Sequence, residues 1–94
     1  MSKPIYTQAA QQDLADIVEY ISRDKPEAAW AWLDKIEDKC LLIARQPSVG
    51  DLQPHLGDGV RASVVGRYVI FHRSKEDRLE ILRVIAGDRD IRYL

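Results

Sequence analysis

The 94-residue chain contains few of the residues that build metal or disulfide sites: it has one cysteine and two histidines. The single cysteine, Cys40, cannot form a disulfide within the chain, and its place in a helical pattern indicates a small buried side chain. His55, His72 and Cys40 lack the close spacing that metal ligands show, so we expect neither a metal site nor a cofactor.

The sequence also lacks a long apolar segment and a large net charge. No stretch approaches the ~20 apolar residues of a membrane span, and residues 1–17 lack the unbroken apolar segment of a signal peptide, so we expect a cytoplasmic protein without membrane contact. A formal net charge of -1 argues against a protein that holds nucleic acid through a strong positive field. The length and the 46% hydrophobic composition predict one domain over residues 1–94.

Short apolar runs late in the chain predict a sheet. Residues 67–71 and 79–86 are rich in β-branched and aromatic side chains, and the polar bend 74–77 joins them, so we expect an antiparallel hairpin. Residues 60–65 end at Gly66 and predict a third strand of the same meander. Near the start of the chain, residues 5–6 predict a short edge strand.

Two amphipathic patterns precede the meander. The first begins after Thr7, a predicted N-cap, and its apolar positions recur at helical spacing: Ala10, Leu14, Ile17, Val18 and Ile21. The second starts at Pro26, with Asp24 as its predicted cap, and runs to about Gln46 before Pro47. The order strand, helix, helix and three strands predicts an α+β fold in which a helical hairpin packs on one face of a mainly antiparallel sheet.

The central strands are apolar on both faces, so both faces of the sheet need cover. A single helical hairpin covers one face, and we expect the second face to remain open for a partner segment. Trp30 and Trp32 lie two residues apart and cannot both point along one helical stripe. We expect Trp32 to pack at the sheet margin and Trp30 to cover loop residues, with a partner-binding Trp30 as the alternative.

Arg83 interrupts the apolar run of an interior strand. A charge in that position is costly unless it is paired or lies at a functional surface, so Arg83 either meets a carboxylate or opens onto a groove. His72 could belong to a catalytic triad, but the chain has no nucleophile-elbow motif, and a lone strand histidine is most often structural.

Three segments resemble the closing half of the RelE/ParE superfamily of bacterial toxins: residues 59–61, 65–73 and 79–91. The helical hairpin that starts at Pro26 is similar too, so the resemblance spans essentially the whole chain. It implies the toxin of a type II toxin-antitoxin system, of the kind that includes plasmid-stabilisation systems. Its partner would be a cognate antitoxin, ParD-like or of another DNA-binding family, which wraps the toxin and supplies the only link to operator DNA.

The superfamily contains two activities, and the resemblance favours the ParE-like branch, which inhibits DNA gyrase. The alternative is a RelE-like, ribosome-dependent endoribonuclease of messenger RNA. Arg61 stands where RelE-like toxins have a lysine and Arg89 matches their arginine after the last strand, but Tyr68 replaces the strand arginine that stabilises charge on the phosphate. If the chain were a nuclease, Arg61, His72 and Arg89 would carry the reaction.

The resemblance also supplies candidate binding residues. For the target we expect Arg61, Arg83, Arg89 and Tyr93, and for the antitoxin Trp30, Tyr68 and Ile70. A third reading is a toxin fold that has lost its toxicity and survives as a binding partner or co-repressor subunit.

Overall fold

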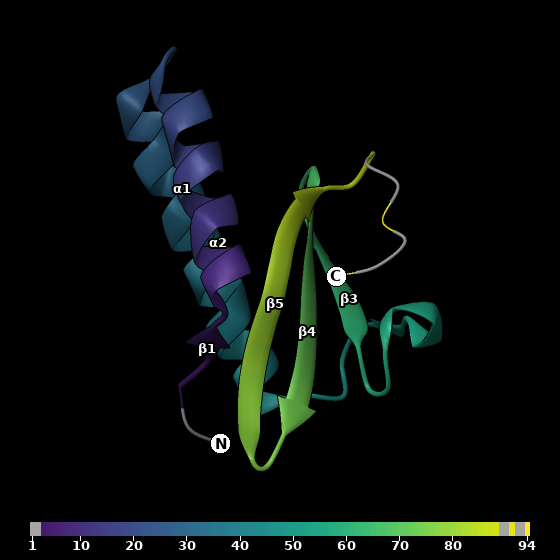
Figure 1. Ribbon diagram of the computed structural model, residues 1–94. Coiled ribbons are helices and arrows are strands. Elements are labelled where there is room, and N and C mark those ends of the chain that lie inside the picture. The colour runs from purple at the N-terminus through teal and green to yellow at the C-terminus, as the bar shows by residue number, and fades with distance from the viewer. Residues whose placement is uncertain (1–2, 89–90, 92–93) are drawn as a thin grey trace.

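A computed structural model describes residues 3–88, 91 and 94, and its elements follow the predicted order (Figure 1). Two helices, α1 (Gln8–Ser22) and α2 (Pro26–Arg45), lie along one side of the sheet. The strands are β1 (Ile5–Tyr6), β2 (Asp51–Leu52), β3 (Arg61–Val65), β4 (Tyr68–Lys75) and β5 (Arg78–Ala86), and a short 3₁₀ helix, η1 (Pro54–Leu56), lies between β2 and β3. The predicted α+β fold is confirmed.

The five strands form one mixed sheet in the order β1-β5-β4-β3-β2. β1 runs parallel to β5, and every other neighbouring pair is antiparallel. Glu76 and Asp77 form the β4-β5 turn with φ of 52° and 62°, the left-handed geometry that matches the twist of a tight hairpin. β2 has only two residues and lies in the connection between α2 and β3.

The helix boundaries follow local signals at three of the four ends. Thr7 caps α1 as predicted, because its Oγ1 accepts a hydrogen bond from the N–H of Ala10 at 3.1 Å. α2 begins at Pro26, whose missing N–H costs nothing in the first turn, and it ends at Arg45, ahead of Pro47. The predicted cap by Asp24 is wrong, since Lys25 occupies the N-cap position.

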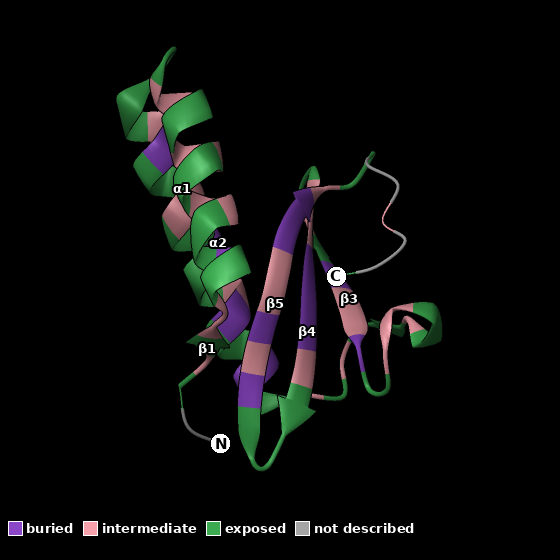
Figure 2. Cartoon of the chain, viewed as in Figure 1, coloured by how far each residue is buried: buried purple, intermediate pink, exposed green. Residues whose placement is uncertain are grey.

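The main core lies between the helices and the sheet, where side chains from both layers become fully buried (Figure 2). Its buried members are Ala10, Ile36, Cys40, Ile43, Ala44, Ile70, Leu79, Ile81 and Val84. Trp32 packs against this core as predicted, and its ring meets Tyr68 edge to face with centroids 5.1 Å apart. Trp30 was expected to cover loop residues, but it is 63% exposed.

The second face of the sheet is covered by the chain itself, so the expectation of an open face is wrong. Val60, Phe71 and Ile85 form a second buried cluster there. Leu56 from η1 and Ile91 beyond β5 pack on this cluster. The need for cover on both faces was read correctly, but loop and tail residues supply it instead of a partner. A partner surface must therefore be sought elsewhere.

Candidate functional site

Arg83 meets a carboxylate, which decides between the two alternatives left open by the sequence. Its Nε and a terminal nitrogen donate to the two oxygens of Asp13 at 2.7 and 2.8 Å. The same carboxylate accepts the backbone N–H of Val84 at 3.0 Å. This hydrogen bonding raises the pKa of Arg83 above its usual range. Arg83 thus ties α1 to β5 and is not a free cation for a target.

An irregularity in β5 accompanies this ion pair. Phe71 pairs with Arg83, whereas the next residue of β4, His72, pairs with Ile81, so Leu82 is an extra residue in β5. A bulge of this kind breaks the alternation of side chains and re-aims its neighbours. After the bulge the alternation is shifted by one residue, so Val84 faces the main core like Ile81, next to Arg83, whose side chain reaches Asp13 on α1.

His72 is fully buried on the helix-facing side of the sheet, because it lies two residues beyond the core residue Ile70 on β4. Its Nε2 and the Oγ of Ser63 are hydrogen-bonded at 2.8 Å. Nδ1 has no hydrogen-bond partner among the described residues. Burial, with smaller contributions from Arg61 and Lys39, lowers the pKa of His72 to about 4. The ring is therefore neutral near pH 7.

Of the three residues predicted for a nuclease, the structure describes Arg61 and His72, and His72 is not exposed. Arg61 lies directly across from His72 in the β3-β4 pair, so both belong to the helix-facing side. A terminal nitrogen of Arg61 donates to the carbonyl of Gly50 at 3.0 Å. Arg89, and with it the target candidate Tyr93, lies outside the described residues. Of the two described members, Arg61 and His72, the histidine is fully buried and cannot act as an accessible acid or base.

The antitoxin candidates fall in three different environments. Trp30 is exposed on α2 and remains available to a partner. Tyr68 is half-buried beside Trp32 at the margin of the core. The assignment of Ile70 is wrong, because its side chain is fully buried between sheet and helices and offers no surface.

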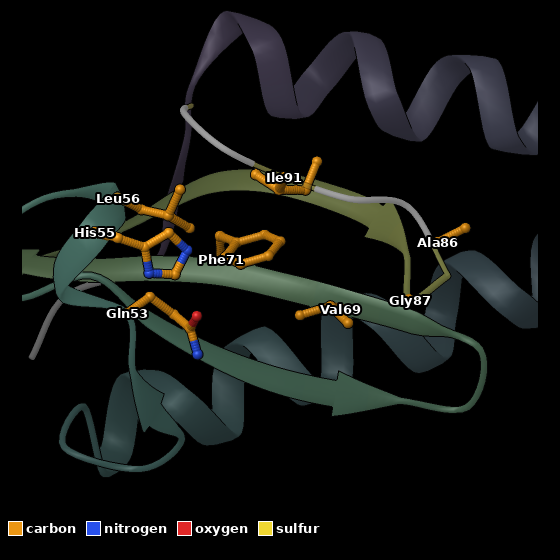
Figure 3. Close-up of a pocket in the computed structure, with 8 residues that line it drawn as sticks. All are labelled: Gln53, His55, Leu56, Val69, Phe71, Ala86, Gly87 and Ile91. Carbon is orange, nitrogen blue, oxygen red and sulfur yellow. The ribbon is translucent and has the colours of Figure 1, made fainter.

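A small hollow remains on the second face of the sheet, with a volume of about 170 Å³ (Figure 3). Val69 and Phe71 lie along its sheet side, while Leu56 and Ile91 approach from the covering segments. Gln53 and His55 add the polar groups. A lone histidine and an amide do not make an acid and base pair, so this hollow has the character of a small binding surface and not of a catalytic centre.

A larger and more apolar concavity is a groove between the two helices, with a volume of about 590 Å³. Leu14, Ala15 and Val18 line it from α1, and Leu33 lines it from α2. Ile5, 43% exposed, lies at its β1 end. Its polar members are Tyr6, Gln11 and Glu37. The groove has the composition of a site for an apolar helix face.

On α2, the apolar surface of this groove extends past the residues that line the concavity. Trp30, Leu33, Glu37 and Leu41 recur at three- or four-residue spacing and therefore share one side of α2. Trp30 and Leu41 are 63% and 47% exposed. The exposed members of this stripe, Trp30 and Leu41, were not predicted to share a surface, although their helical spacing with Leu33 signals it. We call Trp30, Leu33, Glu37 and Leu41, together with the residues that line the 590 Å³ concavity, the helical groove.

Tyr6, which lines the groove, interacts with the buried Cys40. Burial, followed by interaction with Cys40, raises the pKa of the Tyr6 phenol above its ordinary range. Burial likewise raises the pKa of the Cys40 thiol, which fits an unreactive side chain. Within residues 3–88, no three His, Cys, Asp or Glu side chains lie close enough together to hold a metal ion. No helix in the described part of the chain has the length and apolar composition of a membrane span.

Comparisons with known proteins identify a family through one family model and a similar fold through a solved structure. Residues 5–91 match the family model described as the ParE toxin of type II toxin-antitoxin system, parDE. A solved structure titled "Chromosomal ParDE TA system from P. aeruginosa" has a similar fold, with a TM-score of 0.76 and 22% sequence identity. That similarity covers 92% of this chain and 96% of the other. No curated protein matches the chain.

Proposed function

The chain belongs to the ParE toxin family of type II toxin-antitoxin systems, and from this premise we propose that it inhibits DNA gyrase and is neutralised by an antitoxin that binds the helical groove. Inhibition of an enzyme by binding requires a surface and no catalytic groups. The observation that carries the choice against RNA cleavage is the environment of His72, which is fully buried, neutral near pH 7 and bonded to Ser63. Proton transfer to RNA needs an accessible group within hydrogen-bond reach.

A supercoiling assay tests the activity. The purified chain at micromolar concentration is expected to block supercoiling by gyrase or to trap cleaved DNA. A translation extract run in parallel tests the endoribonuclease alternative, because mapped cuts in messenger RNA would identify cleavage. Cut messages together with unaffected gyrase would refute the proposal. Growth without any defect when the chain is expressed without its antitoxin would instead indicate a fold that has lost toxicity.

The surface that meets gyrase is proposed to include the segment after β5. Arg83 is occupied by Asp13, so among the arginines expected at the target Arg61 and Arg89 remain. We expect Arg89→Ala and Tyr93→Ala to weaken inhibition more than Arg23→Ala, a change on the exposed end of the helical hairpin. Equal inhibition by all three variants would remove this surface from the proposal.

The antitoxin argument starts from the exposed apolar side chains of the helical groove. The helical groove has a volume of about 590 Å³ and lies between two antiparallel helices. A third helix can pack there with its side-chain ridges in the groove. Leaving Trp30 and Leu41 in water forfeits about 25 cal/mol for each Å² of apolar surface that a partner could bury. A partner with an amphipathic helix fits this surface best. The toxin would contact operator DNA only through that partner. The toxin would meet both the antitoxin and gyrase in the cytoplasm.

Replacement of Trp30 tests this docking site. Because Trp30 is 63% exposed, Trp30→Ala should leave the folding of the toxin intact. Aromatic anchors at interfaces contribute about 2 kcal/mol or more, so the affinity for the antitoxin should fall about 30-fold. Calorimetric titration measures it, and Lys35→Ala, on the exposed outer face of α2, is the matched control. Equal affinities for the two variants would contradict the proposed groove.

A further inference from the structure

The outer edge of β5 is only partly closed. β1 pairs with Glu80 and Ile81 alone, and the chain then turns into α1. Thr7 continues the closure, because its N–H donates to the carbonyl of Ile81 and its Oγ1 donates to the carbonyl of Leu82. Asp13 closes the next position by accepting the N–H of Val84. The edge is thus closed by β1, by Thr7 and by the Asp13 side chain as far as Val84.

Beyond Val84 the edge is open. In a regular strand every second residue directs its backbone N–H and C=O to the same side, so the N–H of Ala86 points outward like that of Val84. β1 does not extend to this part of β5, and no strand among the described residues pairs with it there (Figure 1). Unpaired backbone groups at a sheet edge form a template for an added strand.

A hollow of about 210 Å³ lies directly beside this open edge. α1 forms one wall with Asp13, Asp16, Ile17 and Tyr20, and the sheet forms the other with Tyr68, Val84, Ile85 and Ala86. Ile17 and Tyr68 offer apolar contacts. The carboxylate of Asp13 is already paired with Arg83, whereas Asp16 is exposed and has a neutral partner, Gln12. The rim therefore presents one carboxylate that lacks a cationic partner in the described chain.

We propose that a short extended segment of the antitoxin adds to β5 at Val84–Ala86 and places a lysine or arginine beside Asp16. The inference rests on the proposed function, since it assigns a second contact to the same partner. The two sites are continuous around α1: Leu14, Ala15 and Val18 face the helical groove, while Asp13, Asp16 and Ile17 face the edge of β5. One antitoxin chain would hold α1 from both sides. Backbone hydrogen bonds supply affinity in such strand addition, and pockets for alternate side chains supply specificity.

Hydrogen exchange of single amides tests the strand. The toxin is examined alone and in complex with its cognate antitoxin. The Ala86 amide should exchange at least tenfold more slowly in the complex. Val64 supplies the matched control, because it lies on the opposite edge of the sheet beyond the two residues that pair with β2, and it is 66% exposed. Its amide should exchange at the same rate in both states.

A charge reversal tests the basic side chain. Asp16→Lys should weaken antitoxin binding about tenfold, whereas Asp38→Lys, on the exposed outer face of α2, should change it by less than twofold. A complex in which the Ala86 amide exchanges as in the free toxin would overturn the added strand, and equal affinities for the two variants would overturn its basic residue. Failure of the antitoxin to bind at all would instead refute the proposed function on which this inference rests.

Discussion

Replacing Asp13 with alanine is expected to lower the free energy of unfolding by about 2–4 kcal/mol. The side chain accepts three hydrogen bonds, at 2.7 and 2.8 Å from Arg83 and at 3.0 Å from the N–H of Val84. Hydrogen bonds to charged groups contribute about 1.5–3 kcal/mol each. The full sum is not expected, because the Arg83 side chain is 26% exposed and regains water when its partner is removed.

Thermal unfolding followed by circular dichroism measures this loss, which corresponds to a decrease of about 10–20 °C in Tm for a domain of this size. Glu19→Ala is the matched control, because Glu19 forms an ion pair with Arg23 in which both side chains are about 70% exposed. Such a surface pair contributes about 0.5 kcal/mol or less. A double-mutant cycle between Asp13 and Arg83 should give a coupling of about 1–3 kcal/mol. A loss for Asp13→Ala no larger than that for Glu19→Ala would refute the reasoning.

Two further predictions concern His72 and Gly50. The folded-state pKa of His72 is about 4, against 6.5 for an ordinary histidine, so its contribution is complete above pH 6.5 and is lost as the pH falls toward 4. Relative to His72→Gln, the wild type should lose about 3 kcal/mol of unfolding free energy over that range in urea titrations, and parallel pH profiles would contradict this. Gly50→Ala should cost about 1–3 kcal/mol more than Gly66→Ala, measured by the same titrations. Gly50 has φ of +88° and its added Cβ would lie 2.6 Å from the carbonyl oxygen of Ala62, whereas Gly66 has open space; equal losses would count against this packing.

The helices and the longer strands could be predicted, because the apolar spacing and the capping or turn residues that define them lie within a few residues of each other in the sequence. The apolar spacing of α1 and α2, the cap at Thr7 and the turn formers around the β4-β5 hairpin act within a few residues of the chain. β2 could not be predicted, because two residues carry no periodicity and their strand conformation depends on pairing with β3.

The cover of the second face depends on isolated residues. Leu56 and Ile91 are single apolar side chains in polar surroundings, so neither produces a pattern in the sequence. Their role as cover follows from their packing against Val60, Phe71 and Ile85 in the folded chain. The need for cover could therefore be inferred from the strands, but its source could not.

The sequence marks Arg83 and His72 as unusual residue types for interior strands, but it does not show the environment of either side chain. Arg83 was recognised as an anomaly, yet its partner Asp13 lies 70 positions earlier in the chain. His72 was considered as an acid or base because sequence alone does not reveal that α2 and Ser63 enclose it. Trp30 is exposed instead of covering loop residues, and Ile70 belongs to the core.

The central claim is that the chain inhibits gyrase and that its antitoxin reverses this by occupying the helical groove. The most direct measurement is a supercoiling assay in which the antitoxin is titrated against a fixed amount of the toxin or of Trp30→Ala. We predict that both toxins inhibit gyrase alike, and that the antitoxin restores supercoiling at lower concentrations for the wild type than for Trp30→Ala. Gyrase that is unaffected by the wild-type chain would contradict the account, and so would identical titration curves for the two toxins.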